Sequence, residues 1–166
     1  VLGRDGWFHT GDLGIIDRDG YLSLRGRLKN MILGPSGENI YPESIESVLN
    51  EYKFVNESVV FEQEGRLIAK VHLDYDALME HMRDFAESAL DKSRDVSRDV
   101  SRIGGEYLSS LRKMVNKRLN AFSKLHSIFE QTEPFEKTPT KKIKRYKYTR
   151  EEEKQSENGN SRREMS

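Results

Sequence analysis

Alternating apolar and polar residues predict two β-hairpins in the first half of the chain. Residues 14–16 and 21–24 are short apolar runs, and the Asp-Gly pair that ends residues 17–20 is typical of the tight turn between hairpin strands. Residues 55–61 and 67–73 repeat this pattern around the polar segment 62–65. We therefore expect one hairpin near the start of the chain and a second one in its middle.

Between and after these hairpins the apolar spacing becomes helical. Residues 34–37 contain Pro and two Gly and are expected to be a loop. A helix should follow at Pro42, because proline suits the first helical turn. Another helix is predicted after Asp74. The apolar stripes are formed by Ile45, Val48, Leu49 and Tyr52 in the first helix and by Leu78, Met82, Phe85 and Ala89 in the second.

The helix after Asp74 and the residues that follow it, to about 122, predict a helical hairpin. Ala89, Val96 and Ile103 recur every seven positions, which gives a narrow apolar seam like that of a coiled coil. Gly104 and Gly105 predict a break, because each glycine costs about 1 kcal/mol relative to alanine inside a helix. A further helix from 106 to about 122 would turn these residues inward: Leu108, Leu111, Val115, Leu119 and Phe122. We interpret the hairpin as a solvated insertion, with a partner-binding or dimerising arm as the alternative.

Composition limits the chemistry of the chain. Of its 166 residues, 28 are Lys or Arg and 28 are Asp or Glu, so the global charge gives no electrostatic case for nucleic acid or an anionic membrane. The absence of cysteine excludes disulfides and thiolate metal sites and suits a reducing, cytoplasmic compartment. No apolar run reaches the roughly 18 residues of a membrane span. We expect a soluble protein with a modest core and a polar tail.

The start of the chain, a short apolar stretch near its end and its histidines add three further expectations. The sequence begins without Met or a signal-peptide pattern, and we interpret it as a fragment of a longer protein. A short strand is predicted near Ile128 and Phe129. The four histidines have no ligand-like spacing, so no metal site is expected at His9, His72, His81 and His126.

Asp12 and Arg27 are the first candidate binding residues. An ionised Asp offers two acceptor oxygens, which suit the paired 2′ and 3′ hydroxyls of a ribose, although a lone Asp in this setting also caps turns. Arg27 follows fifteen positions later, across the predicted turn at 17–20. A hairpin would therefore bring the two side chains to one place.

Residues 137–148 form a basic cluster with two interleaved tyrosines, Tyr146 and Tyr148. A lysine ammonium is a compact charge that can neutralise negative charge on carboxylate and phosphate oxygens. The same cluster could instead hold a nucleic-acid backbone and stack on bases. The neutral global charge and the upstream residues favour the first interpretation. The cations are Lys137, Lys141, Lys142, Lys144, Arg145 and Lys147.

Three segments, residues 10–12, 26–29 and 137–142, resemble in order and spacing the C-terminal part of the AMP-forming adenylating enzymes, and among them most of all the long-chain fatty acyl-CoA synthetases. The resemblance implies an α+β lid, with a small antiparallel sheet and flanking helices, preceded by a β-hairpin from the large N-terminal adenylation domain. It divides the chain into residues 1–28 at the end of that domain, a lid over 29–148 with a helical insertion at about 75–103, and a disordered tail over 149–166.

The resemblance also assigns roles around the nucleotide. It implies that Asp12 and Arg27 hold the ribose and that Leu24 packs against the nucleotide. Lys29 matches the hinge about which the lid turns, since hinges are residues at the ends of elements that absorb a large backbone change.

Two loops of the lid receive catalytic roles in the same way. The loop with Ser36, Gly37 and Glu38 resembles the one that faces coenzyme A during thioester formation. Lys142 matches the lysine that meets the reacting carboxylate and the α-phosphate of ATP. The sequence departs from the family pattern Pro-Lys-Thr-x-x-Gly-Lys at two positions, with Glu136 in place of the proline and Lys141 in place of the glycine.

The function implied is that of an ATP-dependent ligase. The resemblance implies that a carboxylic acid, a long-chain fatty acid in the most similar enzymes, is activated as acyl-AMP and transferred to coenzyme A. The ligands of Mg²⁺ would lie in the N-terminal domain. The partners implied are that domain and the three substrates, and the fragment alone should be inactive. We expect no nucleic-acid partner. Peripheral membrane contact, self-association through the insertion and a non-catalytic scaffolding role are left open.

Overall fold

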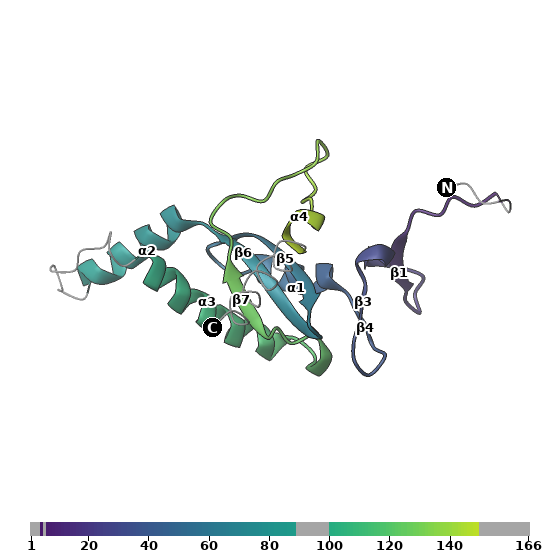
Figure 1. Ribbon diagram of the computed structural model, residues 1–166, viewed down its shortest axis with the longest axis horizontal. Helices are drawn as coiled ribbons and strands as arrows, with labels where there is room; N and C mark the ends of the chain where they lie inside the picture. The colour runs from purple at the N-terminus through teal and green to yellow at the C-terminus, as the bar shows by residue number, and fades with distance from the viewer. Residues whose placement is uncertain (1–3, 5, 89–99, 150–166) are drawn as a thin grey trace, which may run out of the picture.

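The computed structural model describes residue 4 and residues 6–88 and 100–149. Within these ranges, two small hairpins are followed by a three-stranded sheet with helices packed on it (Figure 1). This arrangement confirms the α+β class. The predicted tail from 149 and the heptad segment at 89–99 lie almost entirely outside the described residues. The predicted domain boundaries remain predictions.

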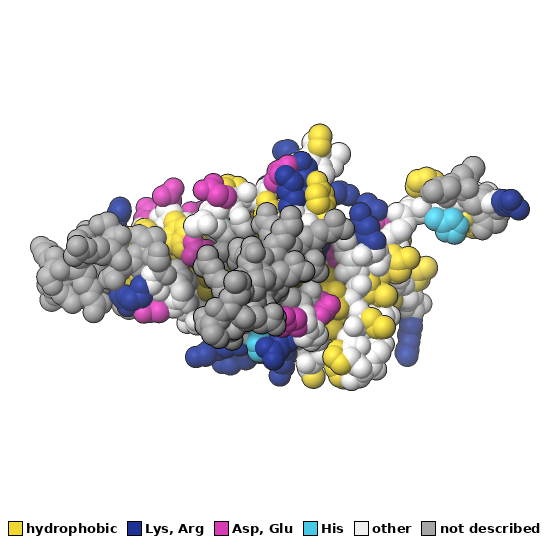
Figure 2. Space-filling model, in the orientation of Figure 1, with side chains coloured by type: hydrophobic (Ala, Val, Ile, Leu, Met, Phe, Trp, Pro, Cys, Tyr) yellow, Lys and Arg dark blue, Asp and Glu magenta, His cyan; other side chains and the backbone are white. Residues whose placement is uncertain are grey.

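The first hairpin forms where the apolar alternation predicts it. Strand β1, Asp12–Ile16, pairs antiparallel with β2, Leu22–Arg27. The Oδ1 atom of Asp17 accepts hydrogen bonds from the backbone N–H groups of Asp19 and Tyr21, which closes the turn. The hairpin leaves large apolar side chains exposed, and Figure 2 shows hydrophobic side chains gathered over this end of the molecule. Such a patch fits contact with a further protein surface.

A second, smaller hairpin leads into the first helix. The 3-10 helix η1, Leu28–Asn30, is followed by β3, Ile32–Leu33, which pairs antiparallel with β4, Asn39–Ile40. Helix α1, Pro42–Asn50, starts with proline as predicted. Its residues Ile45 and Leu49 are fully buried, which confirms the predicted apolar stripe.

The main sheet has the order β5-β6-β7 and is mixed rather than antiparallel throughout. Strands β5, Val55–Gln63, and β6, Arg66–Leu73, form the predicted antiparallel hairpin. Strand β7, Ser127–Glu130, lies parallel to β6, so the prediction of an antiparallel sheet is wrong for this strand. Helices α2, Tyr75–Ser88, and α3, Val100–Arg118, connect β6 to β7 and return the chain to run in the same direction.

Helix α3 runs through Gly104 and Gly105, so the predicted break is wrong. A Cβ on the buried Gly104 would collide with the hydroxyl group of Tyr75 on α2. The absence of a side chain therefore permits close packing of α2 against α3, which lie side by side in Figure 1. The predicted helix also ends earlier, at Arg118, and a 3-10 helix over Ala121–Ser123 follows; Phe122, expected inward, is 57% exposed.

The two faces of the main sheet have separate cores, because side chains of β5 and β6 alternate between them. Val60 and Ala69 pack with α1, α2 and α3 on one face. Val59, Phe61 and Ile68 pack on the other face. Phe135 and Tyr148 complete this second cluster, and Tyr148 lies on the short helix α4, Tyr146–Thr149. No helix within the described residues is long and apolar enough to cross a membrane.

Candidate functional site

Asp12 and Arg27 meet across the first hairpin, as their spacing predicts. The two residues are register partners, and Arg27 Nε lies 2.8 Å from Asp12 Oδ1. Arg27 Nη1 also donates to the carbonyl oxygen of Thr10 at 3.0 Å. About two fifths of each side chain is exposed, so both retain polar surface for a ligand. Leu24, on the same strand, is 71% exposed and available for apolar packing.

Lys29 lies in η1, exposed, between the first hairpin and the rest of the chain. The next residue, Asn30, donates from Nδ2 to Oε1 of Glu43 on α1 at 2.6 Å. The other oxygen of Glu43 is buried with no hydrogen-bond partner within the described residues. A Cβ on Gly26 would collide with this carboxylate, so β2 and α1 touch closely at the expected hinge. No pattern in the sequence indicated this contact.

The loop between β3 and β4 holds Ser36, Gly37 and Glu38 in a compact turn. Gly37 has a φ of +81°, a conformation that favours glycine, and its N–H donates to the Gly34 carbonyl at 2.9 Å. The backbone N–H of Ser36 donates to Oε2 of Glu38 at 3.1 Å. The Glu38 carboxylate therefore folds back over its own loop.

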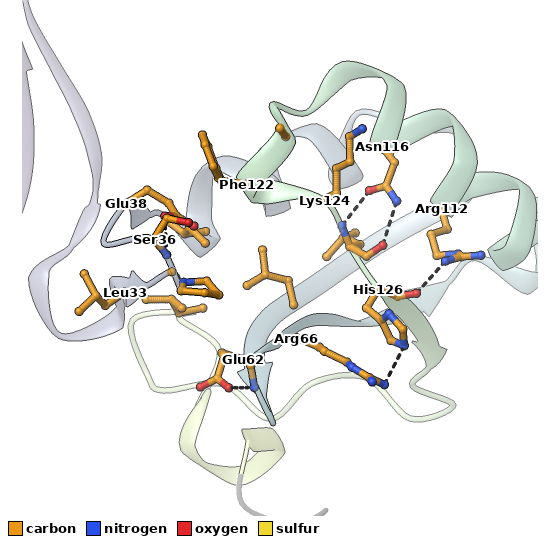
Figure 3. A pocket seen from close by; sticks show the side chains of 18 residues that line it. Leu33, Ser36, Glu38, Glu62, Arg66, Arg112, Asn116, Phe122, Lys124 and His126 are labelled. Atoms are coloured by element: carbon orange, nitrogen blue, oxygen red, sulfur yellow. Dashed lines mark hydrogen bonds between the residues drawn. The ribbon is translucent and has the colours of Figure 1, made fainter.

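This loop forms one wall of a pocket of about 880 Å³. The opposite wall comes from β6, α3 and the segment before β7 (Figure 3). There Arg112 Nη1 donates to the carbonyl oxygen of His126 at 2.7 Å, and Arg66 Nη1 lies 3.3 Å from Nε2 of the same histidine. Lys124 lines the pocket beside them. Cationic side chains thus lie on the wall opposite the Ser36–Glu38 loop, where Arg66 and Arg112 are directed toward His126. Linear spacing did not reveal this grouping.

Lys142 is carried on a tight turn. The N–H of Thr138 donates to the Lys142 carbonyl at 2.8 Å, and the N–H of Lys141 donates to the Thr138 carbonyl at 2.9 Å. Lys141 has a φ of +60°, in the left-handed region that glycine favours. The family pattern has glycine at this position, so the geometry supports the alignment that assigns the following residue, Lys142, to the reactive lysine. The Lys142 side chain is exposed.

Most cations of the basic segment are engaged within the chain. Glu136, which stands where the family pattern has proline, forms ion pairs with both Lys144 and Lys147. The hydrogen bond from Lys144, and after it the one from Lys147, holds the pKa of Glu136 below its usual range. Two further pairs join this segment to the sheet and α1: Lys137 with Glu57 and Arg145 with Glu46.

The described residues contain no group of three or more His, Asp and Glu that could hold a metal ion. The family resemblance implies that the ligands of Mg²⁺ lie in the N-terminal adenylation domain.

No protein-family model matches the sequence. The chain is 54% identical over 56 residues to the fatty acid–[acyl-carrier-protein] ligase ScoC of Streptomyces coeruleorubidus, a match that covers 34% of this chain and 11% of the relative. It is 36% identical over 96 residues to the 2-succinylbenzoate–CoA ligase of Geobacillus sp. (strain WCH70), covering 54% of this chain and 19% of the relative.

The fold has matching solved structures. An ATP-bound RpMatB-BxBclM chimera aligns with a TM-score of 0.59 and 26% identity over 89% of this chain and 25% of the other. The fold therefore matches part of the fold of adenylate-forming enzymes. The chain is similar to acyl- and aryl-CoA ligases, and it spans about a tenth to a fifth of the length of the curated relatives named above.

Proposed function

We propose that the chain is the C-terminal lid region of an AMP-forming ligase that activates a carboxylic acid as acyl-AMP and transfers the acyl group to coenzyme A. The single observation that carries this proposal is the placement of the candidate groups on either side of Lys29. The Asp12–Arg27 pair precedes it, and the Ser36–Glu38 loop and the Lys142 turn follow it.

In the first half-reaction the proposed role of Asp12 is to accept hydrogen bonds from the ribose hydroxyls of ATP, with Arg27 fixing the carboxylate. Leu24 offers an apolar contact beside them. Lys142 would approach the carboxylate and the α-phosphate and neutralise the charge that develops on their oxygens. A lid that turns about Lys29 would deliver this lysine only when both substrates are bound.

In the second half-reaction the lid would present the Ser36–Glu38 loop and the pocket behind it. Gly37 allows a close backbone approach to a thin ligand such as the pantetheine arm of coenzyme A. Arg66, Arg112 and Lys124 would then meet the phosphate groups of its nucleotide, because guanidinium and ammonium groups bind phosphate well. The thiol attacks the acyl carbonyl carbon and AMP leaves with the electron pair of the broken bond.

A long-chain fatty acid is the acyl substrate that we propose. The sequence resembles the long-chain synthetases, and ScoC is a fatty acid ligase by name, whereas the Geobacillus relative acts on 2-succinylbenzoate. The pocket that would select the acid is not assigned to any described residue. We further propose a cytoplasmic location, which the absence of cysteine from the sequence suits.

Nucleic-acid binding is a weaker alternative for residues 137–148. Four of the six cations there are held by carboxylates of the same chain, at Lys137, Lys144, Arg145 and Lys147. Ion pairs within the chain lower the net charge offered to a phosphate backbone.

The test is an assay of the enzyme in which this chain is joined to its large adenylation domain. With ATP, Mg²⁺ and coenzyme A, release of AMP should depend on added acid and be greatest for long-chain fatty acids. The 166-residue chain alone should release none. Release that is independent of acid, or activity of the chain alone, would contradict the proposal.

A further inference from the structure

A largely buried ion pair covers Val60 at the free edge of the main sheet, beside the Lys142 turn. Arg145 Nη1 donates to Oε2 of Glu46 at 2.7 Å, and Arg145 Nη2 donates to the carbonyl oxygen of Val60 at 2.8 Å. The N–H of Val60 donates to Oε1 of Glu46 at 2.5 Å. Because β5 is an edge strand, the pair satisfies both outward backbone groups of Val60.

The pair joins the two faces of the sheet. Glu46 lies on α1, which packs on the helical face of the sheet through Ile45 and Leu49. Arg145 follows Ile143, which packs with the cluster on the opposite face. The hydrogen bonds at Val60 therefore connect the helix that follows the Ser36–Glu38 loop with the segment that carries Lys142.

Burial makes this connection stiff. The side chains of Arg145 and Glu46 are 21% and 11% exposed. Burial raises the pKa of Glu46, and the hydrogen bond and charge of Arg145 act in the opposite direction. An unpaired charge at such a place is strongly unfavourable, so each group holds the other in position.

The path from Arg145 to Lys142 is short and ordered. Ile143, one of the two residues between them on the chain, forms an antiparallel bridge with Lys137 across the base of the turn. The N–H of Lys144 donates to the Glu136 carbonyl at 2.8 Å. A shift of Arg145 would therefore move the turn as a whole.

We propose that Glu46 and Arg145 are positioning residues for Lys142, which keep its turn and the Ser36–Glu38 loop on one rigid body. The catalytic consequence rests on the function proposed above. The two reactive surfaces of the lid then turn together, and the Lys142 turn does not move by itself.

The first test uses the purified 166-residue chain and amide hydrogen exchange. In Arg145→Lys the shorter cation cannot donate to Glu46 and Val60 in the same planar geometry. Exchange of the Thr138 and Lys141 amides should rise about tenfold or more relative to that of the Gly37 amide. If the Arg145→Lys chain does not fold, Glu46→Gln carries the test, because glutamine keeps the size and one acceptor oxygen of glutamate.

The matched control is Leu111→Ala, which opens the core on the helical face. It should raise amide exchange throughout the lid, and exchange in the Lys142 turn should rise no more than exchange elsewhere. If Arg145→Lys and Leu111→Ala give the same pattern of exchange, the positioning role is wrong.

The second test measures the two half-reactions in the enzyme that joins this chain to its large domain. Arg145→Lys should lower kcat for acyl-AMP formation about tenfold, leave KM for ATP unchanged, and spare thioester formation from supplied acyl-AMP. Equal slowing of both half-reactions would overturn the proposal. If the unsubstituted enzyme has no ligase activity, the proposed function fails, whereas the exchange result still decides whether the pair orders the turn.

Discussion

Arg27 donates from Nε to Oδ1 of Asp12 at 2.8 Å, and the two residues are direct partners in the register of the first hairpin. The strands leave this pair at an exposed place, so its contribution to folding stability is small, about 1 kcal/mol or less. A binding role would explain it better than a structural one.

Arg27→Ala should therefore weaken nucleotide binding without unfolding the protein. In the enzyme with its large domain, we expect the Kd for AMP to rise about tenfold or more, because the Asp12 carboxylate loses the group that fixes it. Isothermal titration of AMP measures this change. Arg25→Ala, on the same strand but not opposite Asp12, is the control and should bind AMP as the unsubstituted protein does. Equal loss in both variants would contradict the assignment.

The conformation of Lys141 gives a stability prediction. Its φ of +60° is costly for a residue with a Cβ, by roughly 1 kcal/mol, and costs glycine little. Lys141→Gly should raise the free energy of unfolding by up to about 1 kcal/mol in urea titrations. Lys141→Ala removes the same side chain but keeps the Cβ, so it should give no such gain. A glycine variant that is less stable than the alanine variant would show that the turn has another conformation.

Glu136 should make the stability of the chain depend on acid pH. Lys144 and Lys147 lower its pKa in the folded state, so its stabilising contribution is present above its ordinary pKa of 4.5 and is lost as the pH falls through the folded value. Glu136→Gln should lower the Tm at pH 7, and its effect should diminish as the pH falls below 4.5. Glu133→Gln, outside this cluster, is the control. A difference in Tm that grows on acidification would contradict the assignment, and high salt should reduce the difference at pH 7.

Gly104 and Gly105 should respond oppositely to the same substitution. Gly104→Ala places a methyl group against the Tyr75 hydroxyl, which Glu130 holds by a hydrogen bond of 2.7 Å, and should destabilise the chain by about 1–3 kcal/mol. Gly105 faces open space, so Gly105→Ala should stabilise α3 by up to about 1 kcal/mol. Thermal unfolding of the two variants measures both effects. The packing described for α2 and α3 would be wrong if both substitutions stabilised the protein.

The sequence predicted elements whose signals are local. The hairpin turns at 17–20 and 62–65, the proline start of α1 and the closeness of Asp12 and Arg27 all follow from residues near one another in the chain. The break at Gly104 was mispredicted because helix propensity ignores a neighbour that needs the space. The orientation of β7 was mispredicted because it depends on the path of two intervening helices.

In the candidate site, too, some residues were indicated by local sequence motifs and others are brought together only by tertiary packing. Motif spacing indicated Lys142, Lys29 and the Ser36–Glu38 loop. It did not indicate Glu43 at the hinge, the cations Arg66 and Arg112, or the Glu46–Arg145 pair, because each contact joins residues that are far apart in the sequence and depends on tertiary packing. The positive φ of Lys141 supplied a check on the motif alignment that the sequence could not provide.

The most direct test of the account is the rate of each half-reaction in the Lys142→Ala enzyme, measured in single turnovers. Loss of one well-placed cation should slow acyl-AMP formation by about 10²- to 10³-fold. Thioester formation from supplied acyl-AMP should stay near the unsubstituted rate, because the lid then presents the Ser36–Glu38 loop instead. Lys141→Ala should leave both rates nearly unchanged. Equal slowing of the two half-reactions by Lys142→Ala, or no slowing of either half-reaction, would contradict a lid that presents two surfaces in turn.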